Sequence, residues 1–200
     1  MTAYDIARGG LNLFMRSLWR MEVTGLENVP MTGPLVVACN HVSYVDPVAL
    51  GCALPRPLWY MAKSELFAIP VLGPAIALVN AFPVDRSKGG LAAIRKSVSI
   101  LKEGKAIGIF PEGTRNLQGN AEEKGGAALL ASLSGALVLP AAVIGSARAS
   151  KLGKIRVAFG EPIRVERNRK AAGDDLKKWT LEIMSRIRGL EEQIGAHSAG

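Results

Sequence analysis

Apolar and polar residues along this chain follow two different periods. Runs with alternating polar and apolar residues lie at 154–159 and 163–165. Continuous apolar runs, typical of buried strands, lie at 34–39, 58–62, 82–84, 106–110 and 136–142. Elsewhere apolar residues recur every three or four positions, which predicts helices at 4–20, 90–102 and 174–193. Two further helices are expected at 47–53, where Pro47 suits the first helical position, and at 126–134, a run of small residues. Apolar strands that alternate with helices predict an α/β fold with a buried, mostly parallel or mixed sheet.

The first predicted helix is amphipathic. One side of its helical wheel carries Tyr4, Ala7, Leu11, Phe14 and Leu18, and the other carries Asp5, Asn12, Arg16 and Arg20. Such a helix can lie in a membrane interface with its arginines toward lipid phosphates. It can equally pack on the domain as an ordinary amphipathic helix. We therefore expect this helix at 1–22, one domain at 23–195 and a flexible tail at 196–200.

Two long uncharged stretches, 66–84 and 125–147, raise the question of a transmembrane helix. A spanning helix needs about 20 mostly apolar residues in an unbroken run. Prolines interrupt both stretches, so we expect a buried helix followed by a buried strand in each and no transmembrane helix. We also expect no signal peptide, because Asp5 precedes any apolar run.

The composition indicates a folded globular protein, since 48% of the 200 residues are hydrophobic and 21% are charged. A net charge of +8 favours a polyanionic partner. Aromatic residues are scarce and no nucleic-acid-binding motif is present, so lipid or phosphate is favoured over nucleic acid. The two cysteines, Cys39 and Cys52, are expected to be buried reduced thiols, and the lack of a Cys/His cluster argues against a metal site.

The first segment with catalytic chemistry is 40–46, whose sequence is NHVSYVD. A neutral imidazole at His41 can accept a proton from an attacking hydroxyl, and Asp46 can orient the ring through its other nitrogen. Asp46 also precedes Pro47 and suits a helix N-cap, and one carboxylate can fill both roles. His41 as a plain loop histidine is the alternative. Cys39 would lie too far from His41 along an extended strand to be activated as a nucleophile, and Ser43 is a nearer candidate. Direct attack by a substrate hydroxyl is preferred, because it needs only a base and a group to orient it.

The second segment is 110–115, with the sequence FPEGTR. Arg115 can bind phosphate oxygens in a bidentate fork, and Glu112 can position that arginine or accept from a substrate hydroxyl. A structural turn with a surface ion pair is the alternative. Lys63 and Arg86 also follow strand ends, although a solvated surface charge explains either one taken singly. Both motifs follow apolar strands, so we expect the His41 and Arg115 side chains to face one crevice.

Four segments in this order resemble the glycerolipid acyltransferases, specifically the 1-acylglycerol-3-phosphate acyltransferase (lysophosphatidic acid acyltransferase) family. Residues 41–46 resemble its His-x4-Asp box, and 110–115 its phosphate-binding Pro-Glu-Gly-Thr block. Residues 84–86 resemble a block that ends in a substrate-binding arginine. Residues 139–142 resemble a later block in which the proline, here Pro140, is thought to shape the acyl pocket. Asn80 and Ala81 occupy a place where the family often has glycine.

The resemblance implies a single-domain mixed sheet flanked by helices and an O-acyltransferase activity. His41, oriented by Asp46, would deprotonate the free hydroxyl of 1-acylglycerol-3-phosphate, and the alkoxide would attack the thioester of acyl-CoA or acyl-carrier protein to give phosphatidic acid. No metal or cofactor is implied, and the protein is expected on the cytoplasmic face of the cell membrane, at an anionic lipid surface. The residues implied to hold the acceptor phosphate are Lys63, Arg86, Glu112, Gly113, Thr114 and Arg115.

Two other functions fit the same residues. The same chemistry could act on another lysophospholipid or on a hydroxylated lipid, because phosphate-binding positions do not identify the acceptor. A basic peripheral membrane-binding protein without turnover would explain the composition and the first helix. That protein would not need the His41 and Asp46 pair or the Glu112 and Arg115 block.

Overall fold

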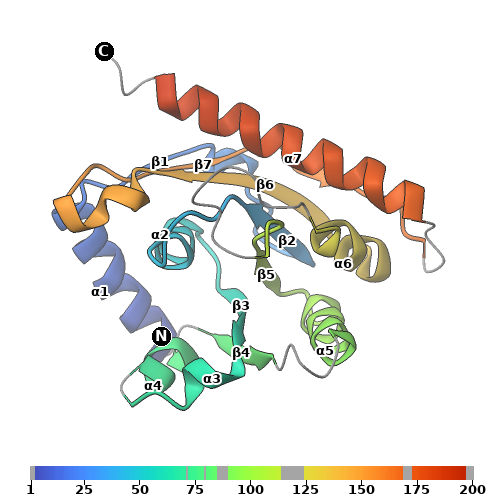
Figure 1. The fold of residues 1–200 in the computed structure, drawn as a ribbon, viewed down its shortest axis with the longest axis horizontal. Helices are drawn as coiled ribbons and strands as arrows, with labels where there is room; N and C mark the ends of the chain where they lie inside the picture. Colours follow the sequence, from blue (N-terminus) through green and yellow to red (C-terminus); the bar gives the residue numbers. More distant parts are fainter. Residues whose placement is uncertain are drawn as a thin grey trace.

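The fold is built on one mixed β-sheet (Figure 1). The computed structural model describes residues 3–70, 72–78, 80–84, 90–113, 124–168 and 173–196. The sheet has the order β1-β7-β6-β2-β5-β3-β4, and β8 pairs with β6 outside this path. The strands are β1 (Glu22–Thr24), β2 (Leu35–Cys39), β3 (Leu58–Lys63), β4 (Ala81–Val84), β5 (Ala106–Ile109), β6 (Leu137–Ile144), β7 (Arg156–Phe159) and β8 (Ile163–Arg164).

Strand β2 lies at the centre of the sheet, parallel to β5 on one side and to β6 on the other. Strands β3, β4 and β5 are also parallel to one another, whereas β7 and β8 run antiparallel to β6. The register pairs Ala38 of β2 with Ile109 of β5. The carboxyl ends of β2 and β5 therefore meet at one edge of the sheet, and the predicted mixed α/β sheet is confirmed.

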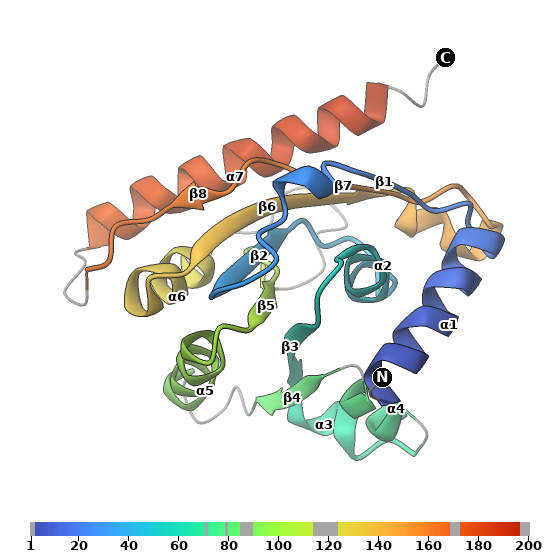
Figure 2. The same ribbon diagram turned by 180° about the vertical axis from the view of Figure 1, so that it is seen from behind.

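Helices cover both faces of the sheet (Figures 1 and 2). One face packs against α1 and α2 through a core cluster that includes Met15, Leu50 and Val37. The other face packs against α5, α6 and α7 through a cluster that includes Val36 and Ile187. The helices are α1 (Ala3–Leu18), α2 (Asp46–Ala53), α3 (Ser64–Phe67), α4 (Leu72–Leu78), α5 (Leu91–Lys102), α6 (Gly126–Ser134) and α7 (Gly173–Ala196).

Helix α1 ends earlier than predicted, and the structure shows which of its sides packs on the domain. It ends at Leu18, and Arg20 adopts a positive φ of 46° that does not continue a helix. Its most buried described side chain is Met15, whereas Phe14, predicted on the single apolar side, is 52% exposed. The helix therefore packs by the side centred on Met15 and leaves a second set of apolar side chains facing outward.

Two further predictions need correction. The sequence pattern missed β1, a three-residue edge strand that pairs with β7. The stretch 66–84 contains the end of α3 and all of α4 before β4, and the exposed Pro74 and Ala77 show that α4 is not buried as predicted. In the described part of the chain, no helix combines the length and the apolar character needed to cross a bilayer.

The predicted division of the chain between residues 22 and 23 falls within β1, directly after its first residue, Glu22. Helix α1 and strand β1 join the same structure, because Met15 of α1 lies in the core under the sheet and β1 is one of its strands. Asn80, at the place where the related family often has glycine, adopts a positive φ of 61°. Asn tolerates this left-handed conformation better than most residues, so the turn into β4 needs no glycine.

Candidate active site

The chain leaves the sheet at Asn40, directly after β2. The Asn40 side-chain amide pairs with the backbone of Val143 on β6: Nδ2 donates to its carbonyl oxygen over 2.9 Å, and Oδ1 accepts from its N–H over 2.8 Å. The pairing of β2 with β6 ends with Cys39 opposite Ala141. The buried Asn40 side chain adds two hydrogen bonds to β6 beyond this last pair. This side chain fixes the position from which the backbone turns into His41.

His41 and Asp46 form a buried pair in the following turn. His41 Nδ1 lies 3.0 Å from Asp46 Oδ2, and the same oxygen accepts from the N–H groups of Val42 and Ser43 over 2.7 Å each. Asp46 is fully buried, and the His41 side chain is 15% exposed. A carboxylate that accepts at Nδ1 places the ring proton there and leaves Nε2 unprotonated. The pair therefore has the geometry of an oriented general base.

The expected helix cap at Asp46 is wrong. Val45 is the N-cap of α2, Asp46 is the first helical residue, and no side-chain cap bond is present. The Asp46 carboxylate instead accepts from the turn before the helix, through Oδ2, while its buried Oδ1 has no hydrogen-bond partner within the described residues. A carboxylate in the first turn still interacts favourably with the positive end of the helix dipole.

The second motif lies against the first. Glu112 Oε2 accepts from the backbone N–H of His41 over 3.0 Å, and Glu112 is itself buried. The Phe110 ring stacks on the His41 imidazole with ring centroids 4.2 Å apart and an interplanar angle of 25°. These contacts bring residues 40–46 and 110–113 together at the carboxyl ends of β2 and β5.

Lys124 is a site residue that the sequence interpretation missed. Its backbone N–H donates to the Pro111 carbonyl oxygen over 2.7 Å, so the chain returns to the second motif here. Gly113 has a positive φ of 68°, and a Cβ on it would lie 2.9 Å from Lys124 Cδ and 3.1 Å from Nζ. The lysine ammonium therefore lies beside the Glu112–Gly113 turn. A lysine directly before the Gly125–Gly126 helix start was the only local signal.

The other predicted phosphate ligands are less completely described. Lys63 is exposed at the end of β3, which pairs with β5 and reaches the same edge of the sheet. Arg86, Thr114 and Arg115 lie outside the described residues, and so does the spatial relation expected between His41 and Arg115.

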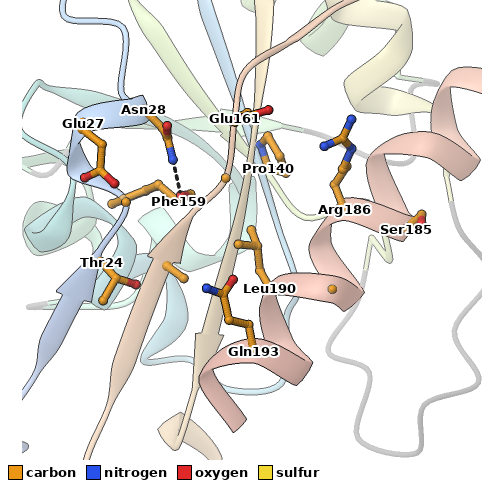
Figure 3. Close-up of a pocket in the computed structure, with 14 residues that line it drawn as sticks. Thr24, Glu27, Asn28, Pro140, Phe159, Glu161, Ser185, Arg186, Leu190 and Gln193 are labelled. Atoms are coloured by element: carbon orange, nitrogen blue, oxygen red, sulfur yellow. Dashed lines mark hydrogen bonds between the residues drawn. The ribbon is translucent and has the colours of Figure 1, made fainter. Parts of the chain in front are cut away.

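Pro140 lies on β6, on the face that packs against α7 (Figure 3). A Cβ on Gly160 would lie 3.2 Å from both Pro140 Cγ and Leu190 Cδ1, so Pro140 faces α7. It lines a groove of about 470 Å³ between η1 (Leu26–Asn28), β7 and α7. The predicted acyl-pocket role of Pro140 stays a prediction, and this groove is not purely apolar, because its lining includes Glu27, Glu161 and Arg186.

Neighbouring side chains do not offer a better nucleophile than a substrate hydroxyl. Burial, chiefly, raises the pKa of the Cys39 thiol well above its ordinary value, so a thiolate is strongly disfavoured. Ser43 Oγ accepts from the Val45 N–H over 3.2 Å and stabilises the turn. In the described ranges, no group of three His, Cys, Asp or Glu side chains comes together as a metal site.

Strand β3 fixes the start of α2, which carries Asp46. The Tyr60 hydroxyl donates to the Pro47 carbonyl oxygen over 2.7 Å. Its ring lies directly over Gly108 of β5, where an added Cβ would come within 2.5 Å of Tyr60 Cε1. Glycine at position 108 therefore leaves room for the Tyr60 ring to lie over β5 and contact α2 on the same face of the sheet.

Comparisons with known proteins match this chain to proteins named 1-acyl-sn-glycerol-3-phosphate acyltransferase. The chain is 33% identical over 196 residues to a 1-acyl-sn-glycerol-3-phosphate acyltransferase of Bacillus subtilis, covering 96% of this chain and 98% of that protein. It is 32% identical to the Pseudomonas aeruginosa protein of the same name over 190 residues, covering 88% of this chain and 73% of that one.

The fold is similar to the crystal structure of the 1-acyl-sn-glycerophosphate (LPA) acyltransferase PlsC from Thermotoga maritima. The TM-score is 0.72 at 25% identity, covering 95% of this chain and 80% of that chain. Residues 20–144 match the Acyltransferase family, and this range contains β2, β5 and both site motifs. The chain belongs to the acyltransferase family.

Proposed function

We propose that this enzyme transfers a fatty acyl group to the free hydroxyl of 1-acylglycerol-3-phosphate and so makes phosphatidic acid. The observation that carries the proposal is the His41–Asp46 pair, with Nδ1 held by a buried carboxylate at 3.0 Å and Nε2 left as the acceptor. The names of the Bacillus subtilis and Thermotoga maritima relatives support the same acceptor.

The chemistry follows from this pair. The acceptor hydroxyl gives its proton to His41 Nε2 as its oxygen attacks the thioester carbon of the donor. The tetrahedral intermediate expels the thiolate, which takes the proton back from the imidazolium and leaves as the free thiol. Asp46 keeps Nδ1 as the donor and stabilises the imidazolium formed between these two steps. The donor is acyl-CoA or acyl-carrier protein, since both present the same thioester.

The acceptor phosphate needs cations beside this base. Lys124 lies against Gly113, next to the carboxylate that accepts from the His41 N–H. We assign the phosphate to Lys124 together with the predicted ligands Lys63, Arg86, Thr114 and Arg115. Glu112, which is buried and bonded to the His41 backbone, then serves to join the two motifs, and Gly113 leaves room for Lys124 beside the turn.

Helix α1 supports a location at the anionic cytoplasmic face of the cell membrane. Its outward side carries Ile6, Leu13 and Phe14, which are 62%, 69% and 52% exposed. Arg16 and Arg20, both exposed, lie near the carboxyl end of the same helix. An apolar side flanked by arginines suits the headgroup region of an anionic bilayer. The lipid substrates would then reach the enzyme from the membrane surface.

The test is an acyltransfer assay on a panel of lysophospholipids with acyl-CoA and with acyl-carrier protein. We expect 1-acylglycerol-3-phosphate to be the preferred acceptor and His41→Ala to lower kcat roughly 10²–10⁴-fold. His197→Ala is the matched control and should keep the parent rate. A His41→Ala enzyme at full rate would reject the base. Preference for another lysophospholipid would reject the acceptor, and wild-type binding to anionic vesicles without acyl transfer would favour a binding module.

The proposed phosphate ligands are tested separately, through the KM values for the acceptor and the donor. Lys124→Ala and Arg115→Ala should each raise the KM for the acceptor more than the KM for the acyl donor, because only the acceptor carries the phosphate that they are proposed to hold. Lys177→Ala, at an exposed position on α7, is the control. Equal effects on both KM values would contradict this assignment.

A further inference from the structure

A carboxylate from the last helix reaches the active-site turn. Glu191 of α7 accepts from Asn40 Nδ2 through Oε1 over 2.7 Å. Asn40 is the residue directly before His41, and its amide already holds the Val143 backbone through both of its polar atoms. Glu191 therefore satisfies the remaining donor of a buried amide beside the proposed base.

Asn40 and His41 project to opposite sides, as successive residues of an extended chain do. Asn40 meets α7 through Glu191, and His41 meets α2 through Asp46. The peptide between them donates its N–H to Glu112. A change in the Asn40 side chain would therefore move the backbone from which the imidazole is held. Glu191 is the α7 side chain that holds this amide, on the side of the chain opposite to the His41–Asp46 pair.

We propose that Glu191 is a positioning residue for acyl transfer: by accepting from Asn40, it fixes the Asn40–His41 backbone and keeps Nε2 of His41 aligned with the acceptor hydroxyl. The proposal rests on the proposed function for its kinetic readout. It gives the last helix, α7, a role in positioning the base, although α7 lies outside the four segments that resemble the acyltransferase family.

The electrostatics of the position support a role beyond stability. Burial raises the pKa of Glu191, and the nearby Glu112 carboxylate raises it further, while the Asn40 hydrogen bond and Arg188 oppose the rise. Glu192 adds to the repulsion. An ionised carboxylate is thus unfavourable at this place, and an apolar residue would avoid the cost. What Glu191 provides is an acceptor aimed at Asn40.

Two variants of Glu191 separate positioning from packing. Glu191→Leu keeps the bulk but removes the acceptor, and we expect kcat to fall about tenfold, the scale of one hydrogen bond that involves a charged group. Both KM values should stay within about twofold, because the acceptor and donor sites are untouched. Glu191→Gln keeps an amide oxygen that can accept from Asn40 and should restore kcat to near the parent value.

The matched control is Ile194→Ala, which removes a buried side chain one turn further along α7 and leaves Asn40 untouched. It should lower the melting temperature at least as much as Glu191→Leu while keeping the parent kcat at a temperature where both variants are folded. If Ile194→Ala loses kcat equally, or if Glu191→Leu keeps the parent kcat, the proposal is wrong. Failure of Glu191→Gln to restore kcat would also overturn it.

A readout independent of turnover uses the two histidines. In ¹⁵N-histidine NMR spectra, Glu191→Leu should shift the ring signals of His41 and leave those of His197 in place, whereas Ile194→Ala should shift neither. Unchanged His41 signals would contradict positioning. If the wild type transfers no acyl group but Glu191→Leu still shifts the His41 signals, the proposed function fails and the positioning contact stands.

Discussion

The two terminal helices pack on opposite faces of the same sheet, yet their outer sides differ (Figures 1 and 2). Helix α7 presents mostly polar residues to solvent, and the exposed large apolar side chain on it is Leu181. Helix α1 exposes Ile6, Leu13 and Phe14. The outer side of α7 suits water, whereas that of α1 suits an apolar surface.

Toward the interior, the two helices resemble each other. Each sends one charged side chain to an element that holds the active site. Arg8 of α1 donates through Nη1 to the carbonyl oxygen of Leu54, which caps the carboxyl end of α2, over 2.9 Å. Glu191 of α7 accepts from Asn40. Arg8 thus contacts the far end of α2, whereas Glu191 contacts the residue directly before His41, and of these two helices α1 has the outer side suited to lipid.

The largest expected effect is at the His41–Asp46 turn, which follows the residue that Glu191 contacts. Asp46→Asn presents an amide to His41 Nδ1 and favours the wrong ring tautomer, so kcat should fall roughly 10²–10⁴-fold in the acyltransfer assay. Binding to anionic vesicles should not change, because α1 is untouched. Asp175→Asn, in the exposed first turn of α7, is the control and should keep the parent rate. A parallel loss of vesicle binding would show that catalysis and membrane contact are not separable as the comparison requires.

The second effect tests the outer sides directly. Leu13→Asn combined with Phe14→Asn should weaken binding to vesicles of equal parts phosphatidylglycerol and phosphatidylcholine at least about tenfold, since each fully buried side chain is worth about 1.5–3 kcal/mol. Co-sedimentation measures it, and the melting temperature should stay near the parent value because both side chains are exposed. Leu181→Asn on α7, with a side chain 54% exposed, should bind like the parent. Equal losses in the two variants would remove the distinction between the helices.

A smaller effect is expected at the inner contact of α1. Arg8→Met keeps the aliphatic stem but removes the donor to the last turn of α2, and should lower the free energy of unfolding by about 1 kcal/mol. Urea unfolding measures it. Arg186→Met, on the exposed side of α7, should leave stability nearly unchanged. Stability unaffected by Arg8→Met would mean that the contact with α2 contributes nothing.

The smallest effect is the pH dependence of stability at the inner contact of α7. Glu191 has a raised pKa, so the folded state binds its proton more tightly than the unfolded state does. Its favourable contribution is present below the ordinary carboxyl pKa and is lost as pH rises through the folded-state pKa. Stability of the wild type relative to Glu191→Gln should therefore decrease from acidic to neutral pH in urea unfolding. A difference that does not vary with pH would contradict this sign.

Much of the fold was predictable because strands and helices have distinct periods. The apolar runs before residues 40 and 110 became β2 and β5, and the placement of both motifs at their carboxyl ends followed. The short edge strand β1 was not predicted, because a segment of three residues shows no clear period. Phe14 is 52% exposed, and the sequence left open whether the apolar side of α1 packs on the domain or faces a membrane, because periodicity alone does not choose between the two.

The sequence by itself determined the α/β class and predicted a base at His41 oriented by Asp46 and a turn at 111–113, because these depend on periods and residue chemistry within a few positions. Only the tertiary structure decided that Glu112 accepts from the His41 backbone, that Lys124 returns beside Gly113 and that Glu191 reaches Asn40. These contacts join segments far apart in the chain. The order of the strands and the packing of α7 determine these contacts. A local pattern of apolar residues indicates which face of an element is buried, but it does not indicate which other segment covers that face.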